Sequence, residues 1–235
     1  MPLSTIIFII FLAAAVLASY KSKKLTAYGA VTGGMVAVLI WLGSGIAGIA
    51  QLGVFFVLSV LATSHKKQYK SSLQTQTHEQ IRNSWQVLAN GGIAAICGVF
   101  AYLFLANAPV FQLMMAGAFA SALADTLSSE LGSVYGKRFY NIITSKPDER
   151  GKDGVVSVEG ILIGLAGSAV IAAVYSFYYG FNTVFFIILI AGTAGNLIDS
   201  ILGATLERRG IIGNNTVNVL NTFAAAIIVW LLYML

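Results

Sequence analysis

The stretch FASALADTLSSE, residues 119–130, places Asp125 inside an apolar segment that is long enough to cross a membrane. A second stretch, IAGTAGNLIDS at residues 190–200, does the same with Asp199. A carboxylate at membrane depth costs several kcal/mol unless it faces a polar cavity, a metal ion or a partner charge. Two such residues, each followed by a hydroxyl residue, indicate a functional site inside a membrane-embedded helix bundle.

The composition indicates an integral membrane protein. Of the 235 residues, 57% are hydrophobic and 10% are charged, whereas about a quarter of the residues in soluble domains are charged. Apolar runs of spanning length recur along the chain, and no long hydrophilic segment is available for a separate soluble domain. The single cysteine, Cys97, cannot form an internal disulfide, and no Cys/His metal pattern is present.

The hydrophobic pattern predicts an all-α, polytopic membrane helix bundle. We expect one membrane-embedded domain over residues 1–235, with an N-terminal three-helix part at 1–63 and a motif-bearing catalytic part at 82–235. About eight transmembrane helices are expected, at residues 3–19, 25–42, 45–63, 87–105, 110–132, 158–179, 183–206 and 217–235.

The basic residues predict a topology. All 14 Lys and Arg residues fall in four connections that alternate along an eight-helix chain, so they are expected on one membrane face. The positive-inside rule assigns that face to the cytoplasm and both termini to the outside. The net charge of +5 then reflects topology and a phosphate site rather than nucleic-acid binding. We interpret the clusters at residues 21–24 and 66–70 as anchors for anionic headgroups.

Helical spacing gathers polar side chains around both aspartates. Asp125, Ser128 and Ser129 lie on one stripe of their helix, and Asn196 and Asp199 lie on one stripe of theirs. Because both helices run toward the cytoplasm in this topology, the two carboxylates are expected at similar depth and could converge. Two carboxylates together with substrate phosphates are a usual way to hold Mg²⁺. The alternative is two polar contacts between helices without a metal.

The connection at residues 133–157 directly follows the Asp125 helix and is rich in cations and glycines. Such a loop can bind phosphate through charged donors and permissive backbone, with five cations available: Lys137, Arg138, Lys146, Arg150 and Lys152. It is not a P-loop, because Asp153 stands where Ser or Thr is required and no strand precedes it. The alternative is an ordinary positive-inside loop.

Further polar side chains are expected near the same face. Arg82 and Asn90 lie on one stripe at the start of a helix, and Asn218 and Asn221 share a stripe on the last helix. Since Asn90, Asn218 and Asn221 lie deeper than a helix cap, they favour a cavity lined with amides.

Five blocks carry a resemblance to one family, and these blocks occupy residues 82–91, 124–132, 144–147, 151–157 and 197–205. In order and spacing they resemble the integral-membrane family typified by transmembrane protein 19, which includes the plant phytyl-phosphate kinase. The resemblance implies phosphoryl transfer from a nucleoside triphosphate, CTP in the plant case, to an isoprenyl monophosphate. More distantly, it implies kinship with phytol and dolichol kinases and phosphatidate cytidylyltransferases. The chain departs from the family at Gly151-Lys-Asp-Gly154-Val, where the pattern often reads Gly-Thr-Asp-Gly-Gly.

Phosphoryl transfer depends on positioning and charge neutralisation, and each residue receives an expected role on that basis. Asp125 and Asp199 are expected to bind Mg²⁺, Glu130 to act as a further ligand or acid, and Arg82 to contact the acceptor phosphate. The remaining residues are expected to hold the nucleotide or orient phosphate and water, and they are Asn90, Ser128, Ser129, Lys137, Arg138, Lys146, Lys152, Asp153, Ser157, Asn196, Asn218 and Asn221.

Two other classes of function stay open at this point. A carrier or flippase for phosphorylated lipids would also use intramembrane acids and basic loops. A lipid-phosphate cytidylyltransferase would share the metal and nucleotide sites. The expected partners are a nucleoside triphosphate, an isoprenyl monophosphate and membrane lipids, without nucleic acid, and a homodimer is one option for assembly. The expected location is the plasma or inner membrane, with the active site at its cytoplasmic face.

Overall fold

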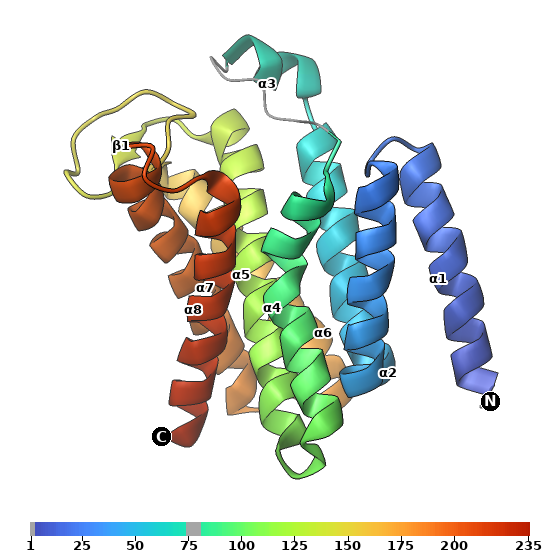
Figure 1. Ribbon diagram of the computed structural model, residues 1–235. Coiled ribbons are helices and arrows are strands. Elements are labelled where there is room, and N and C mark those ends of the chain that lie inside the picture. The colour runs from blue at the N-terminus through green and yellow to red at the C-terminus, as the bar shows by residue number, and fades with distance from the viewer. Residues whose placement is uncertain (1–2, 74–80) are drawn as a thin grey trace.

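The computed structural model describes residues 3–73 and 81–235. Its elements form a bundle in which both termini lie at the same end (Figure 1). In chain order the elements are α1 (Leu3–Lys21), α2 (Ala27–Ser64), α3 (Lys67–Leu73), α4 (Ser84–Leu103), η1 (Leu105–Asn107), α5 (Ala108–Tyr135), β1 (Tyr140–Asn141), β2 (Val155–Val156), α6 (Val158–Tyr179), α7 (Thr183–Leu202), η2 (Gly203–Glu207) and α8 (Asn214–Met234).

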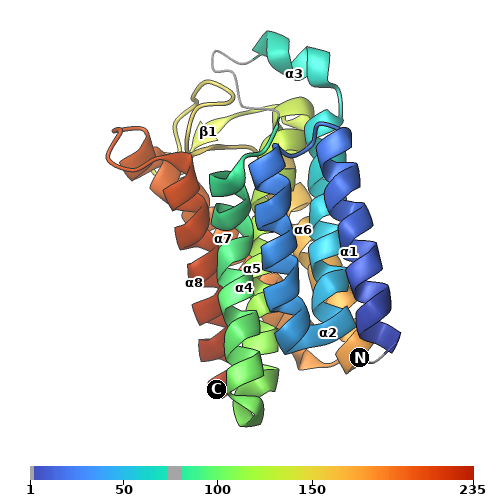
Figure 2. The ribbon, with the colours of Figure 1, turned by 45° about the vertical axis from the view of Figure 1, so that its right-hand side comes forward.

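Helix α2 crosses the bundle twice. It contains 38 residues, and Gly45 in its middle has φ 53° and ψ −138°, outside the helical region. A straight helix of that length would be about 57 Å long. Instead, the ammonium of Lys24, just before the helix, donates to the hydroxyl of Ser64, its last residue, at 2.9 Å. The two halves therefore run side by side in opposite directions, as Figure 2 shows, and glycine supplies the positive φ at the bend.

The structure confirms the predicted fold class. Seven helices of the described chain are long and apolar enough to span a membrane, and α2 contributes two passes because it folds back at Gly45. These eight passes put the connection before α2, the short helix α3, the strands β1 and β2 and the connection before α8 at the end opposite the termini (Figure 1). The basic connections thus share one end, and its assignment to the cytoplasm stays a prediction.

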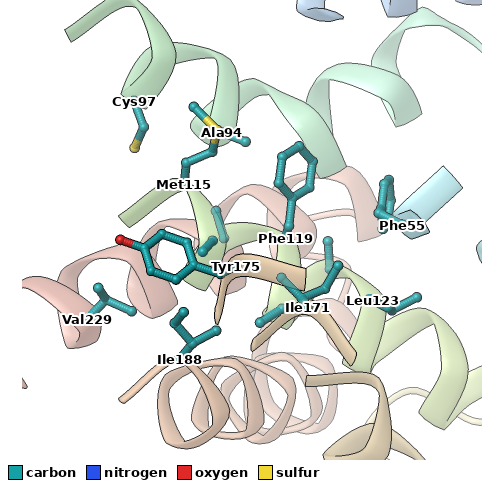
Figure 3. Close-up of a cluster of buried hydrophobic side chains, with 14 of the residues drawn as sticks. Phe55, Ala94, Cys97, Met115, Phe119, Leu123, Ile171, Tyr175, Ile188 and Val229 are labelled. Atoms are coloured by element: carbon teal, nitrogen blue, oxygen red, sulfur yellow. The ribbon is translucent and has the colours of Figure 1, made fainter. Parts of the chain in front are cut away.

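Helix α5 lies at the centre of the bundle. Its spanning window is 67% buried, against 11% for α1, and it packs against α2, α4, α6, α7 and α8. Figure 3 shows its Met115, Phe119 and Leu123 among side chains from neighbouring helices. Small residues let these helices approach closely, as at Gly164, where an added Cβ would lie 3.1 Å from the carbonyl oxygen of Ala124. Asp125 therefore belongs to the best-enclosed helix.

Several helix ends differ from the expected ones. The range 158–179 is confirmed, whereas α4 begins at Ser84 rather than at residue 87. A capping box explains this start, because the Asn83 side chain accepts from the Gln86 backbone while the Gln86 side chain accepts from the Asn83 backbone. Helix α7 ends at Leu202 and continues as the π-helical turn η2. The loop between α5 and α6 contains the antiparallel pair β1–β2, which the sequence did not predict.

Candidate functional site

A polar cavity of about 370 Å³ lies at the end of the bundle that carries the basic connections. Its wall combines α4, α5, α7, η2 and α8 with the loop between α5 and α6, and α3 forms part of its edge. The wall contains these residues that the sequence analysis singled out: Arg82, Asn90, Asp125, Ser128, Ser129, Glu130, Lys152, Asp153, Ser157, Asn196, Asp199 and Asn218. Residues from four of the five sequence blocks, which are far apart along the chain, therefore meet at one place.

The carboxyl groups of Asp125 on α5 and Asp199 on α7 line the same cavity and are close enough to interact directly. Asn221 of α8 donates its amide to Oδ2 of Asp199 at 2.5 Å, and Ser121 donates its hydroxyl to Oδ1 of Asn221 at 3.1 Å. Asn221 is 1% exposed and lies outside the cavity wall, so it holds the Asp199 carboxyl from the buried side, away from the cavity. Two negative charges in contact repel each other strongly away from water. A proton or a cation is therefore needed between them.

The residues present fit a magnesium ion. Mg²⁺ is usually held by one or two carboxylates, together with waters and substrate phosphates. In the described part of the chain no group of three or more His, Cys, Asp or Glu side chains is placed to hold a metal ion. An ion between Asp125 and Asp199 would thus take its other ligands from water, substrate or amides. Asn218 offers one, because its buried Oδ1 has no hydrogen-bond partner in residues 3–73 and 81–235.

Arg82 is fixed by its backbone and presents its charge to the cavity. Its N–H donates to the carbonyl of Lys24 at 3.1 Å, and its carbonyl accepts from the N–H of Thr26 at 3.0 Å. Burial lowers the pKa of Arg82 from its ordinary value, while the charges of Glu130 and Asp125 raise it. Within residues 3–73 and 81–235 its guanidinium makes no salt bridge. Its donors are therefore available to an anion in the cavity.

Lys70 has a different environment from the one expected. Its ammonium pairs with Glu130 and donates to the carbonyls of Ala62 and Thr63 at 2.9 and 2.8 Å. It lines the cavity and is buried, so its interpretation as a headgroup anchor is wrong. Local sequence did not indicate this environment, because the acceptors of Lys70 lie on α2 and α5.

The loop between α5 and α6 is held in place by specific contacts. The Asn141 side chain accepts from the N–H groups of Ile143 and Thr144 at 3.0 Å. Arg208, just after η2, donates to Asp148 at 2.7 Å and to the carbonyl of Asp153 at 3.1 and 2.6 Å. The hydrogen bond from Arg208 lowers the pKa of Asp148 from its ordinary value. Arg208 thus stabilises the loop fold as well as contributing to the charge bias.

The cations of this loop separate into two groups. Lys152 lines the cavity and pairs with Glu149, which lies outside the cavity wall, at 2.9 Å. Lys137, Arg138 and Lys146 are exposed and lie outside the cavity wall. Of these four predicted phosphate ligands, only Lys152 is placed to contact a molecule in the cavity.

Glu207 lines the cavity but was not among the predicted site residues. It ends η2, and its charge interacts with those of Asp153 and Asp199. The loop packs on η2 through two glycines, because a Cβ on Gly203 would lie 2.9 Å from the Gly154 nitrogen and a Cβ on Gly154 would overlap Ala204. A π-helical turn changes the direction of the side chains that follow it, and such turns often occur at functional sites. Regular helical spacing from Asp199 does not indicate this position.

These features define a polytopic integral membrane protein with a polar cavity at one end of its helix bundle and two carboxylates in contact inside it. The chain belongs to the family described as integral membrane protein DUF92, whose sequence model matches residues 10–226. The family resemblance predicted from the sequence blocks is therefore confirmed.

Curated relatives come from distant organisms. An uncharacterized membrane protein of Synechocystis is 35% identical over 237 residues, which cover 96% of this chain and 89% of that protein. One of Methanocaldococcus jannaschii is 31% identical, with 91% of this chain and 87% of that protein covered. The chloroplast protein VTE6 of Arabidopsis thaliana is 29% identical, with 87% and 64% covered. No solved structure matches the chain.

Proposed function

We propose that the protein transfers a phosphoryl group from a nucleoside triphosphate to an isoprenyl monophosphate and so forms the diphosphate, with CTP as the first candidate donor. The observation that carries the proposal is the contact between Asp125 and Asp199 in a cavity that also presents Arg82 and Lys152. Membership of the family supports the same reaction, because the resemblance carried by the sequence blocks implies transfer of a phosphoryl group to an isoprenyl monophosphate. The basic connections at this end of the bundle support its placement at the cytoplasmic face.

The charge of the cavity supports a requirement for a divalent cation. Its wall contains five carboxylates and four cations, and the nine residues are Asp125, Glu130, Asp153, Asp199, Glu207, Lys67, Lys70, Arg82 and Lys152. A triphosphate and a phosphomonoester add several negative charges to a wall that already has a small negative excess. Mg²⁺ held by Asp125 and Asp199 would neutralise charge on the transferring phosphoryl group.

The protein's own residues then position the two substrates. Arg82 would bind the acceptor phosphate through its planar fork of N–H donors, and Lys152 would contact the triphosphate from the loop. Asn221 keeps Asp199 in one orientation. An acceptor oxygen forms a bond to the γ-phosphorus as the bond to the β–γ bridging oxygen breaks, and the nucleoside diphosphate leaves. Because the acceptor is already an oxyanion, no strong general base is required.

Doubly labelled CTP tests this proposal against its two alternatives. The purified protein in lipid nanodiscs would receive an isoprenyl monophosphate, Mg²⁺ and CTP labelled in the γ-phosphate and in the base. A kinase places the γ-label on the lipid and releases CDP. A cytidylyltransferase places the base label on the lipid and releases pyrophosphate, whereas a carrier transfers neither. Either of the last two results would overturn the proposal.

A further inference from the structure

Helix α3 stands clear of the membrane-spanning helices at the cavity end of the bundle (Figures 1 and 2). It nevertheless directs Lys70 inward, and the side chain of this residue is only 7% exposed. The three N–H donors of its ammonium have three acceptors, namely Glu130 and the carbonyls of Ala62 and Thr63. A lysine fully paired in this way is held in one position beside the cavity.

Glu130 interacts with two cations. It pairs with Lys70 directly, and its charge also acts on Arg82. Arg82 has five N–H donors on its side chain but no salt bridge to any described residue. A guanidinium and an ammonium that act on the same carboxylate and line the same cavity have the charge that a phosphate dianion requires, once the phosphate replaces that carboxylate.

The segment that carries Lys70 makes two further contacts with other parts of the protein. Lys66, at the start of the turn, has a φ of 45°, and its ammonium lies 5.0 Å from the centre of the Tyr135 ring at the end of α5. The Tyr69 hydroxyl accepts from Arg150 of the loop at 3.4 Å. Lys70 is therefore positioned by contacts that are independent of its own ion pair.

We propose that Lys70 and Arg82 together form the subsite for the phosphate of a membrane-embedded phosphomonoester, and that Glu130 holds Lys70 in place until this phosphate replaces it. The identity of that ligand as the acceptor rests on the proposed function. In this arrangement Glu130 is a positioning residue that competes with the ligand, rather than a metal ligand.

The position of the subsite favours the lipid phosphate over the nucleotide. Arg82 precedes α4, whose first turns present Gln86 and Asn90 to the same cavity, so this wall runs from the membrane surface inward. A phosphate tied to a chain in the bilayer can approach along such a wall. Lys152 belongs instead to the loop between α5 and α6 and is exposed, so a soluble nucleotide has access to it.

Direct binding to the full-length protein in nanodiscs tests the proposal, with a long-chain alkyl phosphate and CTP as separate probes. Lys70→Gln should raise the Kd of the alkyl phosphate at least tenfold and change the Kd of CTP by less than about twofold. Glu130→Gln should lower the Kd of the alkyl phosphate severalfold, because it removes the competing carboxylate. Lys21→Gln is the matched control, since it removes an exposed cation at the same end of the bundle that lies outside the cavity wall, and should change neither constant.

Lys70→Gln and Glu130→Gln are expected to change the Kd of the alkyl phosphate in opposite directions. If the ion pair were purely structural, both variants would weaken binding. A weaker alkyl phosphate affinity in Glu130→Gln overturns the proposal even if Lys70→Gln does not fold. A loss of CTP affinity in Lys70→Gln with unchanged alkyl phosphate affinity assigns the subsite to the nucleotide and also overturns it. Binding can be measured without turnover, so the two proposals fail separately. If the wild type transfers phosphate but Lys70→Gln leaves the Kd of the alkyl phosphate unchanged, only the subsite is refuted. Lys70-dependent binding without transfer refutes only the kinase.

Discussion

Replacing Asp199 by Asn should remove Mg²⁺ binding while leaving a folded, inserted bundle. The amide retains an oxygen that can accept from Asn221, so the contact that orients residue 199 in the structure persists. The substitution also removes the repulsion between two carboxylates in contact. In the absence of Mg²⁺ we therefore expect the variant to unfold at the same temperature as the wild type or at a higher one.

In the presence of Mg²⁺ the wild type should instead unfold at a higher temperature than Asp199→Asn. An ion present at a hundredfold excess over its Kd stabilises the folded state by about 2.7 kcal/mol. In a chain of this size that corresponds to a rise in unfolding temperature of about 5–10 °C. The wild type should show this rise, and Asp199→Asn and Asp125→Asn should lose most of it. Turnover should fall by about a thousandfold or more in both variants, because each loses several kcal/mol of transition-state stabilisation.

The assay is thermal unfolding in nanodiscs with and without Mg²⁺, followed by phosphoryl transfer at saturating Mg²⁺. Glu159→Gln is the matched carboxylate-to-amide control, because Glu159 lies in the first turn of α6, accepts from the backbone of Lys137 and does not line the cavity. It should keep the full Mg²⁺ response. If Asp125→Asn or Asp199→Asn keeps both the Mg²⁺ response and near-normal turnover, the two-carboxylate metal site is refuted.

Three further predictions follow from the loop and the topology. Lys152→Gln should raise the Kd of CTP about tenfold, since it loses a charge-assisted contact. Lys146→Gln should not raise it, because Lys146 lies outside the cavity wall. Equal effects of the two substitutions would indicate that the cations of the loop only set the topology. Gly154→Ala should destabilise the protein by about 1–3 kcal/mol and reduce turnover, as measured by unfolding and activity. Gly210→Ala is the control for backbone strain, because Gly210 has a similar positive φ but open space around it. An equal loss of stability in Gly154→Ala and Gly210→Ala would exclude a specific contact between the loop and η2. In a cysteine-free background, cysteines at positions 107 and 146 should react with an impermeant thiol reagent from opposite sides of the membrane; labelling from the same side contradicts the eight-pass topology.

Local properties of the sequence were enough to predict the class of fold. Apolar runs of spanning length, separated by charged or turn-forming residues, define the passes, because each pass satisfies its own backbone hydrogen bonds inside a bilayer. The cost of an intramembrane carboxylate likewise indicated Asp125 and Asp199 before their contact was known. The stripe that contains Asn218 was indicated by helical spacing, and Asn218 does line the cavity.

Only the tertiary structure decided which side chains outside regular helices reach the cavity. Lys152 and Lys146 belong to one loop, but the contacts of Arg208 with Asp148 and Asp153 determine how that loop folds over η2. Lys70 was indistinguishable from an anchoring lysine in sequence, because its acceptors lie on α2 and α5. A π-helical turn likewise directs Glu207 into the cavity. In each case the direction of a side chain depends on partners far along the chain, and local spacing carries no information about those partners.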